Sequence, residues 1–167
     1  DLLHEKFGAV WRQIANYFKD YDEHLIFESM NEVPGDEDSI YYLNQIFVNE
    51  VRATGGNNAR RWLSIPGSSA NIASVRKDFK FPEDTAKNRQ FFAVHYYDWY
   101  FGLEESMDKT SFVQKEALQM ERNLIYLEMF YTSQGIPVIM GEYGCIDKRN
   151  TVERAYFNEV MARICQN

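Results

Sequence analysis

The sequence predicts an α/β fold built on a mainly parallel sheet, and three observations support this. Apolar residues switch repeatedly along the chain between helical spacing and short solid runs. The helical segments and the short runs alternate, with one connection that is mostly loop. The runs are mostly apolar, as in strands that are buried on both faces of a parallel sheet. A complete eight-stranded barrel takes about 250 residues, so the four predicted strands form either an open sheet or part of a barrel.

The first elements are a helix, a strand and a second helix. Apolar residues at three- and four-residue steps predict a helix over residues 7–21, and the mostly apolar run 24–30 predicts a strand. Apolar residues at the same helical steps predict a second helix over residues 40–53. The sequence Gly-Gly-Asn-Asn at 55–58 supplies residues that tolerate the left-handed conformation in which helices end.

Two strands with a long connection between them come next. Residues 61–65 are predicted to form a strand that is stopped by Pro-Gly at 66–67. A loop-like stretch around Pro82 leads to the apolar run 91–95, which we expect to be the third strand. This connection departs from the strand–helix alternation of the remaining chain.

The last third of the chain is predicted to contain a helix, a strand and a final helix. Helical spacing predicts a helix over residues 112–133, with Gly135 placed to end it. Residues 136–140 read as a strand, and residues 151–165 as a helix with Asn150 at its N-cap. In the segment 112–133 the helical spacing runs through Leu118, Ile125 and Met129.

Composition excludes several classes of partner. The chain has 167 residues, about one domain, and carries 25 acidic against 18 basic residues, a net charge of −7. Such a surface cannot displace counterions from phosphates, so we expect no nucleic-acid partner and no anionic membrane. No apolar run approaches the roughly 20 residues that span a bilayer. Cys145 and Cys165 form neither a disulfide framework nor a zinc-site pattern.

Polar residues follow three of the predicted strands. Asn31 and Glu32 come after the first strand, His95 and Tyr97 lie at the end of the third, and Glu142 follows the fourth. In parallel α/β proteins the carboxyl ends of strands share one rim, so these side chains are expected to converge. Two carboxyl groups at one site are what glycoside hydrolysis needs.

The two glutamates are expected to have different roles. In a retaining glycosidase one carboxylate attacks the anomeric carbon, while the other donates a proton to the leaving oxygen and later deprotonates water. Hydrogen bonds from Tyr97 and Tyr143 would keep Glu142 ionised as the nucleophile. Partial burial and the nearby negative charge would keep Glu32 protonated as the acid/base, and Asn31 would bind the sugar 2-hydroxyl.

Simpler interpretations of the same residues stay open. A glutamate after a strand is often a solvated loop residue, and a histidine there is often structural. The aromatic cluster at 96–101, which includes Trp99, forms either part of the core, an interface or a surface that stacks on sugar rings. An unrelated open-sheet enzyme would place Glu32 and Glu142 well beyond about 10 Å apart.

Three motifs in register resemble glycoside hydrolase family 5, the endoglucanase family. They are Phe-Glu-Ser-Met-Asn-Glu at 27–32, His-Tyr-Tyr at 95–97 and Ile-Pro-Val-Ile-Met-Gly-Glu-Tyr-Gly at 136–144. The resemblance covers nearly the whole chain, from the helix before barrel strand four to the helix after strand seven. It implies a single half-barrel catalytic domain over residues 1–167, that is, a partial TIM barrel of about four parallel strands with flanking helices.

The resemblance also implies roles for individual residues. Glu32 matches the family's acid/base, Asn31 its 2-hydroxyl partner and Glu142 its nucleophile. His95 and Tyr97 match the pair that contacts substrate and nucleophile. The family is retaining, needs no cofactor or metal, and most often cleaves β-1,4-glucans such as cellulose or related β-mannans. A retaining endo-β-1,4-glucanase is therefore the predicted function.

The departures from the family are one substitution and the missing half of the barrel. Val33 stands where the family usually has proline, a tolerable change in a loop. Nothing corresponds to the first three strands, with their substrate-site arginine and histidine, or to the final strand with its tryptophan. The open edges of four parallel strands need a partner, so we expect a homodimer that completes the barrel, or a separate chain that supplies the other half. A catalytically incomplete glycan-binding fragment is the alternative function.

The start of the chain and the substrate bear on localisation. The chain begins at Asp1 without a basic stretch and apolar segment before it, so a processed product or a piece of a longer chain is expected. A polymeric substrate is too large to enter a cell, which implies a secreted, extracellular protein.

Overall fold

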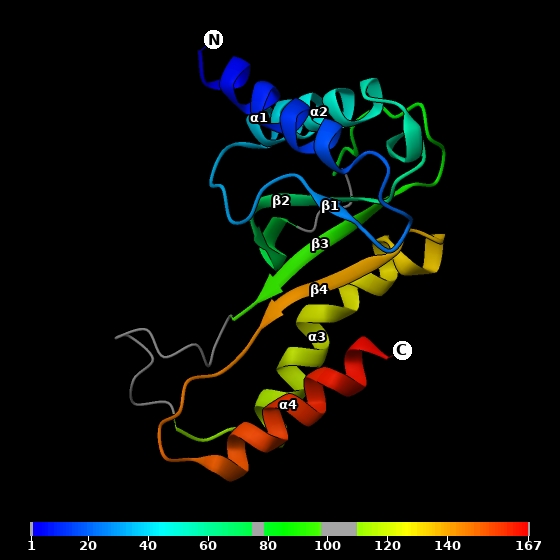
Figure 1. The fold of residues 1–167 in the computed structure, drawn as a ribbon. Coiled ribbons are helices and arrows are strands. Elements are labelled where there is room, and N and C mark those ends of the chain that lie inside the picture. Colours follow the sequence, from blue (N-terminus) through cyan, green and yellow to red (C-terminus); the bar gives the residue numbers. More distant parts are fainter. Residues whose placement is uncertain (1, 75–78, 98–109, 167) are drawn as a thin grey trace.

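A computed structural model describes residues 2–74, 79–97 and 110–166, in which four strands form one sheet flanked by helices (Figure 1). The helices are α1 (Leu2–Phe18), α2 (Glu37–Ala53), α3 (Gln114–Phe130) and α4 (Thr151–Cys165). The strands are β1 (Phe27–Glu28), β2 (Leu63–Asn71), β3 (Gln90–Tyr96) and β4 (Val138–Tyr143). No helix among the described residues is both long and apolar enough to cross a membrane.

The sheet is a half-barrel. Its order is β1-β2-β3-β4, and every neighbouring pair is parallel, so each new strand is added on the same side of the one before it. An open doubly wound sheet reverses its strand order and is covered by helices on both faces, whereas here the order never reverses. The predicted α/β fold with a partial TIM barrel is therefore confirmed.

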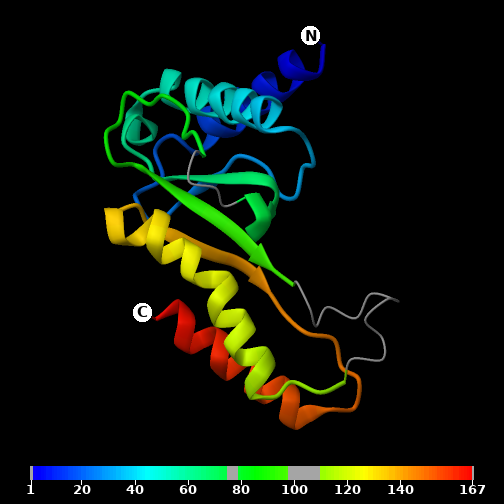
Figure 2. The same ribbon diagram turned by 180° about the vertical axis from the view of Figure 1, so that it is seen from behind.

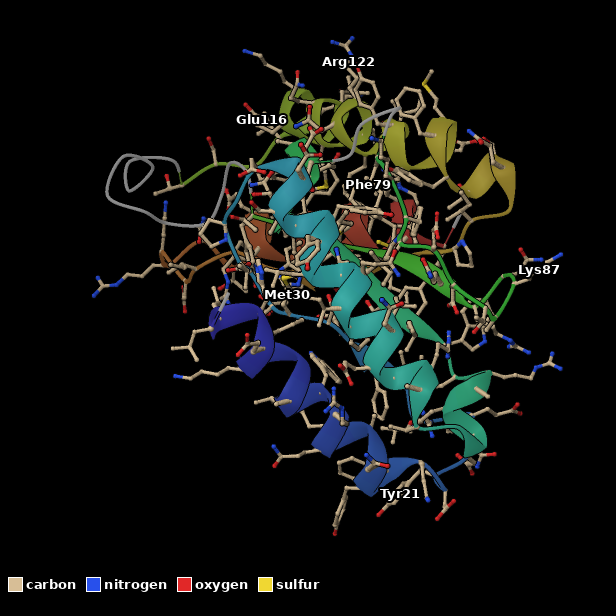
Figure 3. The ribbon with its side chains drawn as sticks, turned by 90° about the horizontal axis from the view of Figure 1, so that it is seen from above. Tyr21, Met30, Phe79, Lys87, Glu116 and Arg122 are labelled. Carbon is tan, nitrogen blue, oxygen red and sulfur yellow. The ribbon has the colours of Figure 1, made fainter. Side chains whose placement is uncertain are left out.

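One face of the sheet forms the core with the helices. Successive side chains of a strand point to opposite faces. The outward-facing ones pack against α1 and α2 near one edge of the sheet and against α3 and α4 near the other (Figures 1 and 2). Leu63 and Ile65 pack with α1 and α2, and Tyr96 packs with α3 and α4. Figure 3 shows α1 and α2 side by side. The largest fully buried side chains are Tyr96, Phe47, Phe92, Leu63, Ile65, Met120 and Met161.

The opposite, inner face of the sheet is polar near β1 and exposed near β4. Glu28 and Ser64 are register partners on this face, and the Ser64 hydroxyl donates to Glu28 Oε2 at 2.6 Å. Ile139, the register partner of Ala93, is 43% exposed. In a complete barrel this face would line the interior, where side chains from all strands meet.

Strand β2 runs through the proline that was predicted to stop it. It continues past Pro66 to Asn71, with an irregularity in its pairing to β3 after Pro66. Ser69 and Ala70 have φ values of 52° and 47° within that irregular stretch. The Pro66 carbonyl accepts a hydrogen bond from the buried side chain of Asn44 at 3.0 Å. A proline tolerated at a bulge therefore does not end the strand.

The connection from β2 to β3 contains no α-helix among its described residues, as predicted, and is anchored by a buried ion pair. Arg52 of α2 donates two hydrogen bonds to Asp84, at 2.8 and 2.7 Å, and both side chains are 7% exposed. Phe79 and Phe81 pack edge-on against Phe92 of β3. These contacts cover the outer face of the sheet where a crossover helix is absent.

Two predicted helix details were wrong, and a third was confirmed. Helix α1 ends at Phe18, and Tyr21 lies beyond it and is exposed (Figure 3). Asn150 is the N-cap residue of α4, as predicted, and its carbonyl accepts from Arg154 N at 3.1 Å, while its side chain donates to the Thr110 carbonyl at 2.6 Å. Helix α3 carries two apolar stripes at helical spacing, and the stripe that it buries lies beside the predicted one. The exposed stripe is Leu118, Ile125 and Met129, and the buried one is Ala117, Met120 and Leu124.

Arg61 fixes the amino-terminal end of the half-barrel from within. It is 2% exposed and has no carboxylate partner among the described residues. Its guanidinium instead satisfies the carbonyls that follow the end of α1, where helix carbonyls lack partners, and it lies over the Phe27 ring. The acceptors are the carbonyls of Phe18, Tyr21, Asp22 and Leu25 and the side chain of Asn58.

We expect Arg61→Met to lower the free energy of unfolding by about 3–5 kcal/mol, because the five hydrogen bonds of the buried guanidinium would be lost together. Urea denaturation followed by circular dichroism measures the change. Arg60→Met, a substitution of the exposed neighbour, is the matched control and should change stability by less than about 0.5 kcal/mol. Equal losses in the two variants would contradict the role assigned to Arg61.

Candidate active site

The carboxyl ends of three strands bring four of the predicted side chains together. Glu32 lies in the loop after β1, His95 and Tyr97 lie at the end of β3, and Glu142 lies in β4. His95 and Glu142 are register partners, so they leave neighbouring strands at the same level. Figure 2 shows the arrowheads of β3 and β4 side by side. Residues far apart in the sequence thus meet at one rim of the half-barrel.

The His95 ring lies between the two carboxylates. Its Nδ1 is 2.7 Å from Glu32 Oε1 and 3.6 Å from Glu142 Oε2. The three groups offer atoms that all lie within 4.8 Å of one another. His95 is 4% exposed in its side chain, while Glu32 and Glu142 are 43% and 41% exposed. This separation contradicts the unrelated open-sheet enzyme, and neither glutamate is a free solvated loop residue.

Tyr97 donates its phenolic hydrogen to Glu142 Oε2 at 2.7 Å. The hydrogen bond to Glu142, together with burial and the nearby carboxylate charges, raises the pKa of Tyr97 to about 12. The phenol therefore keeps its proton at neutral pH and stabilises a negative charge on the Glu142 carboxylate. The expected second donor is absent from this contact, because Tyr143 pairs in register with outward-facing Tyr96 and is itself 41% exposed.

Tyr97→Phe is expected to lower kcat about 10- to 100-fold, since a hydrogen bond to a charged group contributes about 1.5–3 kcal/mol. Because the raised pKa keeps the phenol protonated until pH nears 12, the loss should be the same across about pH 5–9, below even an unperturbed tyrosine's pKa. Steady-state kinetics over this range measures it. An alkaline decline that is present in the native protein and absent in Tyr97→Phe would contradict the prediction. Tyr143→Phe is the control.

Of the remaining predicted residues, one is exposed, one lies outside the described residues and one belongs to the core. Asn31 is exposed and directly precedes Glu32. Trp99 lies outside the described residues. Tyr96 belongs to the core, where it is 1% exposed and its hydroxyl accepts from Asn123 at 3.2 Å. The partial burial that was expected at Glu32 is modest, since its side chain is 43% exposed.

The spacing between His95 Nδ1 and Glu32 Oε1 fits a hydrogen bond better than two ligands of one zinc ion. Tetrahedral zinc with bonds of about 2.0–2.1 Å separates its ligand atoms by about 3.3 Å. The 2.7 Å between His95 Nδ1 and Glu32 Oε1 is shorter than that and suits a shared proton. Cys145 and Cys165 are free thiols outside this group, and burial raises the pKa of each. The arrangement can therefore hold and move protons as it stands.

Two features near the site were missed by sequence reasoning. Glu28 is a third carboxylate on the inner face, and its polar character within an otherwise apolar run was the available signal. Gly141 lies against the His95 ring, at the point where β4 departs from regular pairing. The glycine that directly follows the apolar run was the available signal, since glycine in a strand often marks a bulge.

A parallel half-barrel with two carboxylates and a histidine at the carboxyl ends of its strands has the layout of a TIM-barrel active site. Comparison with known proteins agrees. Residues 3–167 match the family model described as cellulase, glycosyl hydrolase family 5. The chain is 35% identical to Endoglucanase A of Paenibacillus barcinonensis over 89% of its length, and 32% identical to a xyloglucan-specific endo-beta-1,4-glucanase of Bacteroides ovatus over 98%.

Solved structures give the same result. A broad specificity endoglucanase from Ruminococcus champanellensis with bound cellotriose superimposes with a TM-score of 0.89 and 36% identity, over 99% of this chain. A family 5 lichenase from Caldicellulosiruptor sp. F32 in complex with cellotetraose also has a TM-score of 0.89, with 29% identity over 98% of this chain. The chain belongs to glycosyl hydrolase family 5, which confirms the predicted resemblance.

The match covers only part of each relative. The chain spans 45% of the Paenibacillus enzyme and 37% of the Bacteroides enzyme. It spans 52% and 51% of the two solved chains. What is aligned is therefore about half of a family 5 catalytic barrel.

Proposed function

We propose that this chain carries the catalytic glutamates of a retaining endo-β-1,4-glucanase that hydrolyses β-glucans such as cellulose. The observation that supports it best is the separation of the carboxylates. Oxygens of Glu32 and Glu142 lie within 4.8 Å, near the roughly 5–5.5 Å typical of retaining enzymes and short of the roughly 6.5–9.5 Å of inverting ones. Relatives named endoglucanase and structures with bound cellotriose or cellotetraose support the substrate class.

Glu142 is the proposed nucleophile. Its Oε2 accepts from Tyr97, so the carboxylate is stabilised in the charged form that attacks. In the first step a carboxylate oxygen of Glu142 bonds to the anomeric carbon as the bond to the glycosidic oxygen breaks. In the second step a water oxygen replaces Glu142 and releases the sugar.

Glu32 is the proposed acid/base. It gives a proton to the departing glycosidic oxygen and later takes one from the attacking water. His95 Nδ1 lies 2.7 Å from Glu32 Oε1 and so holds this carboxyl group in place. Asn31 is proposed to bind the 2-hydroxyl and Trp99 to stack on a sugar ring, while no cofactor or metal takes part.

Product stereochemistry tests the mechanism. Proton NMR of cello-oligosaccharide hydrolysis should show the β-anomer of the new reducing end first, with the α-anomer following by mutarotation. Reducing-sugar release from carboxymethyl cellulose gives the endo-activity itself. Initial formation of the α-anomer would overturn the retaining mechanism while leaving the hydrolase assignment intact.

Completion of the barrel by a second copy is part of the proposal. The two unpaired edges of the described sheet and the part of the inner face that is exposed at β4 need a partner, and isologous pairing is the commonest symmetry. Sedimentation equilibrium should give twice the 19.7 kDa of one chain. The mass of a single chain would exclude the homodimer and direct attention to the other half as a separate or continuing chain.

A glycan-binding role without hydrolysis is the second candidate, favoured by the openness of the site at Glu32 and Glu142. It predicts retarded migration in a gel containing β-glucan together with no release of reducing sugar. In either role the substrate is a polymer, so we propose an extracellular location.

A further inference from the structure

Strand β4 contains one extra residue at the active site. Val94 pairs with Met140, but the next residue of β3, His95, pairs with Glu142, so Gly141 has no partner of its own. In regular pairing His95 would face Gly141, and Glu142 would point outward beside Tyr96. The extra residue shifts the register by one and places Glu142 on the same face as His95. Bulges of this kind commonly redirect a side chain beside an active site.

The extra residue is pressed against the His95 ring. A Cβ atom at position 141 would lie 3.2 Å from His95 Nε2 and 3.4 Å from Cδ2, closer than an ordinary van der Waals contact. Gly141 is not among the glycines with positive φ, so what the site requires there is space and not an unusual backbone. The ring has little room to retreat, because His95 is 4% exposed and its Nδ1 is held by Glu32.

We propose that Gly141 is a positioning residue for the catalytic pair. As the bulge residue it turns Glu142 toward the inner face, and by lacking a side chain it lets the His95 ring lie where Nδ1 reaches both carboxylates. The inference rests on the proposed glycosidase function for its catalytic consequence, while the geometric consequence for His95 is independent of it.

Gly141→Ala tests the proposal, with Gly144→Ala as the matched control. A Cβ at position 144 would lie 3.7 Å from Tyr97 Cε1, an ordinary contact, so the same chemical change at the same end of β4 meets no obstacle. We expect Gly141→Ala to lower kcat about tenfold with little change in KM, since displacements near 1 Å cost about a hundredfold. Gly144→Ala should stay within about twofold. Equal losses in the two variants would overturn the proposal.

Two further measurements separate positioning from general destabilisation. Gly141→Ala should change the NMR signals of the ¹⁵N-labelled His95 imidazole, and Gly144→Ala should not. In a His95→Ala background the ring is gone, so adding Gly141→Ala should cost less than about twofold. A full tenfold cost in that background would contradict the role. If glucan is not hydrolysed at all, the imidazole signals still decide on Gly141, and only the proposed function fails.

Discussion

Glu142→Gln is expected to lower kcat on carboxymethyl cellulose by at least about ten-thousandfold, as losses of a nucleophilic or essential catalytic group do. The amide has nearly the shape of the carboxylate and still accepts from Tyr97, so the site should stay folded. It carries no charge and cannot form the covalent bond to the anomeric carbon. Reducing-sugar release at matched circular dichroism and oligomeric state measures the effect.

Glu28→Gln is the control for this change, since Glu28 is a carboxylate on the same inner face whose contact with Ser64 an amide can keep. It should leave kcat within a few-fold, and a loss as large as that of Glu142→Gln would contradict a specific role for Glu142. A second readout uses Glu142→Ala with sodium azide and an activated β-cellobioside. Azide should attack the anomeric carbon in place of the carboxylate and give the α-glycosyl azide.

The second large effect is expected for Glu32→Gln, and it should depend on the leaving group. On unactivated glucan the sugar oxygen needs a proton to depart, so kcat should fall by about a hundred- to ten-thousandfold. On 2,4-dinitrophenyl β-cellobioside the leaving phenolate needs none. The first step should then proceed at a near-native rate, and the intermediate should accumulate because no base activates water.

Stopped-flow absorbance of dinitrophenolate measures this as a burst followed by slow turnover. Glu142→Gln should show no burst with the same substrate, because it cannot form the intermediate. A burst in Glu142→Gln and none in Glu32→Gln would reverse the two roles, although the family assignment would stand.

The sequence predicted the strands and the convergence of the polar residues, because both follow from local patterns in a parallel sheet. Apolar runs mark buried strands, and polar residues at their carboxyl ends must converge in a parallel sheet. The faces of α3 could not be assigned, because both stripes have helical spacing and only tertiary packing distinguishes Leu118 from Met120. The extra residue in β4 had only its glycine as a signal, because a bulge is a relation between strands. In the sequence Arg61 stands at the start of a predicted strand, and nothing there indicates that its guanidinium donates hydrogen bonds inside the protein.

Arg61 and the glutamates lie at opposite ends of the same sheet, and this separation bears on how the protein can evolve. The guanidinium precedes β2 at the amino-terminal end, whereas Glu32 and Glu142 lie at the carboxyl ends. Substitutions at distant sites without shared partners have additive effects on stability. Loops around the glutamates can therefore change without destabilising the end of the sheet that Arg61 stabilises, so the site and the folding of the chain are open to separate selection.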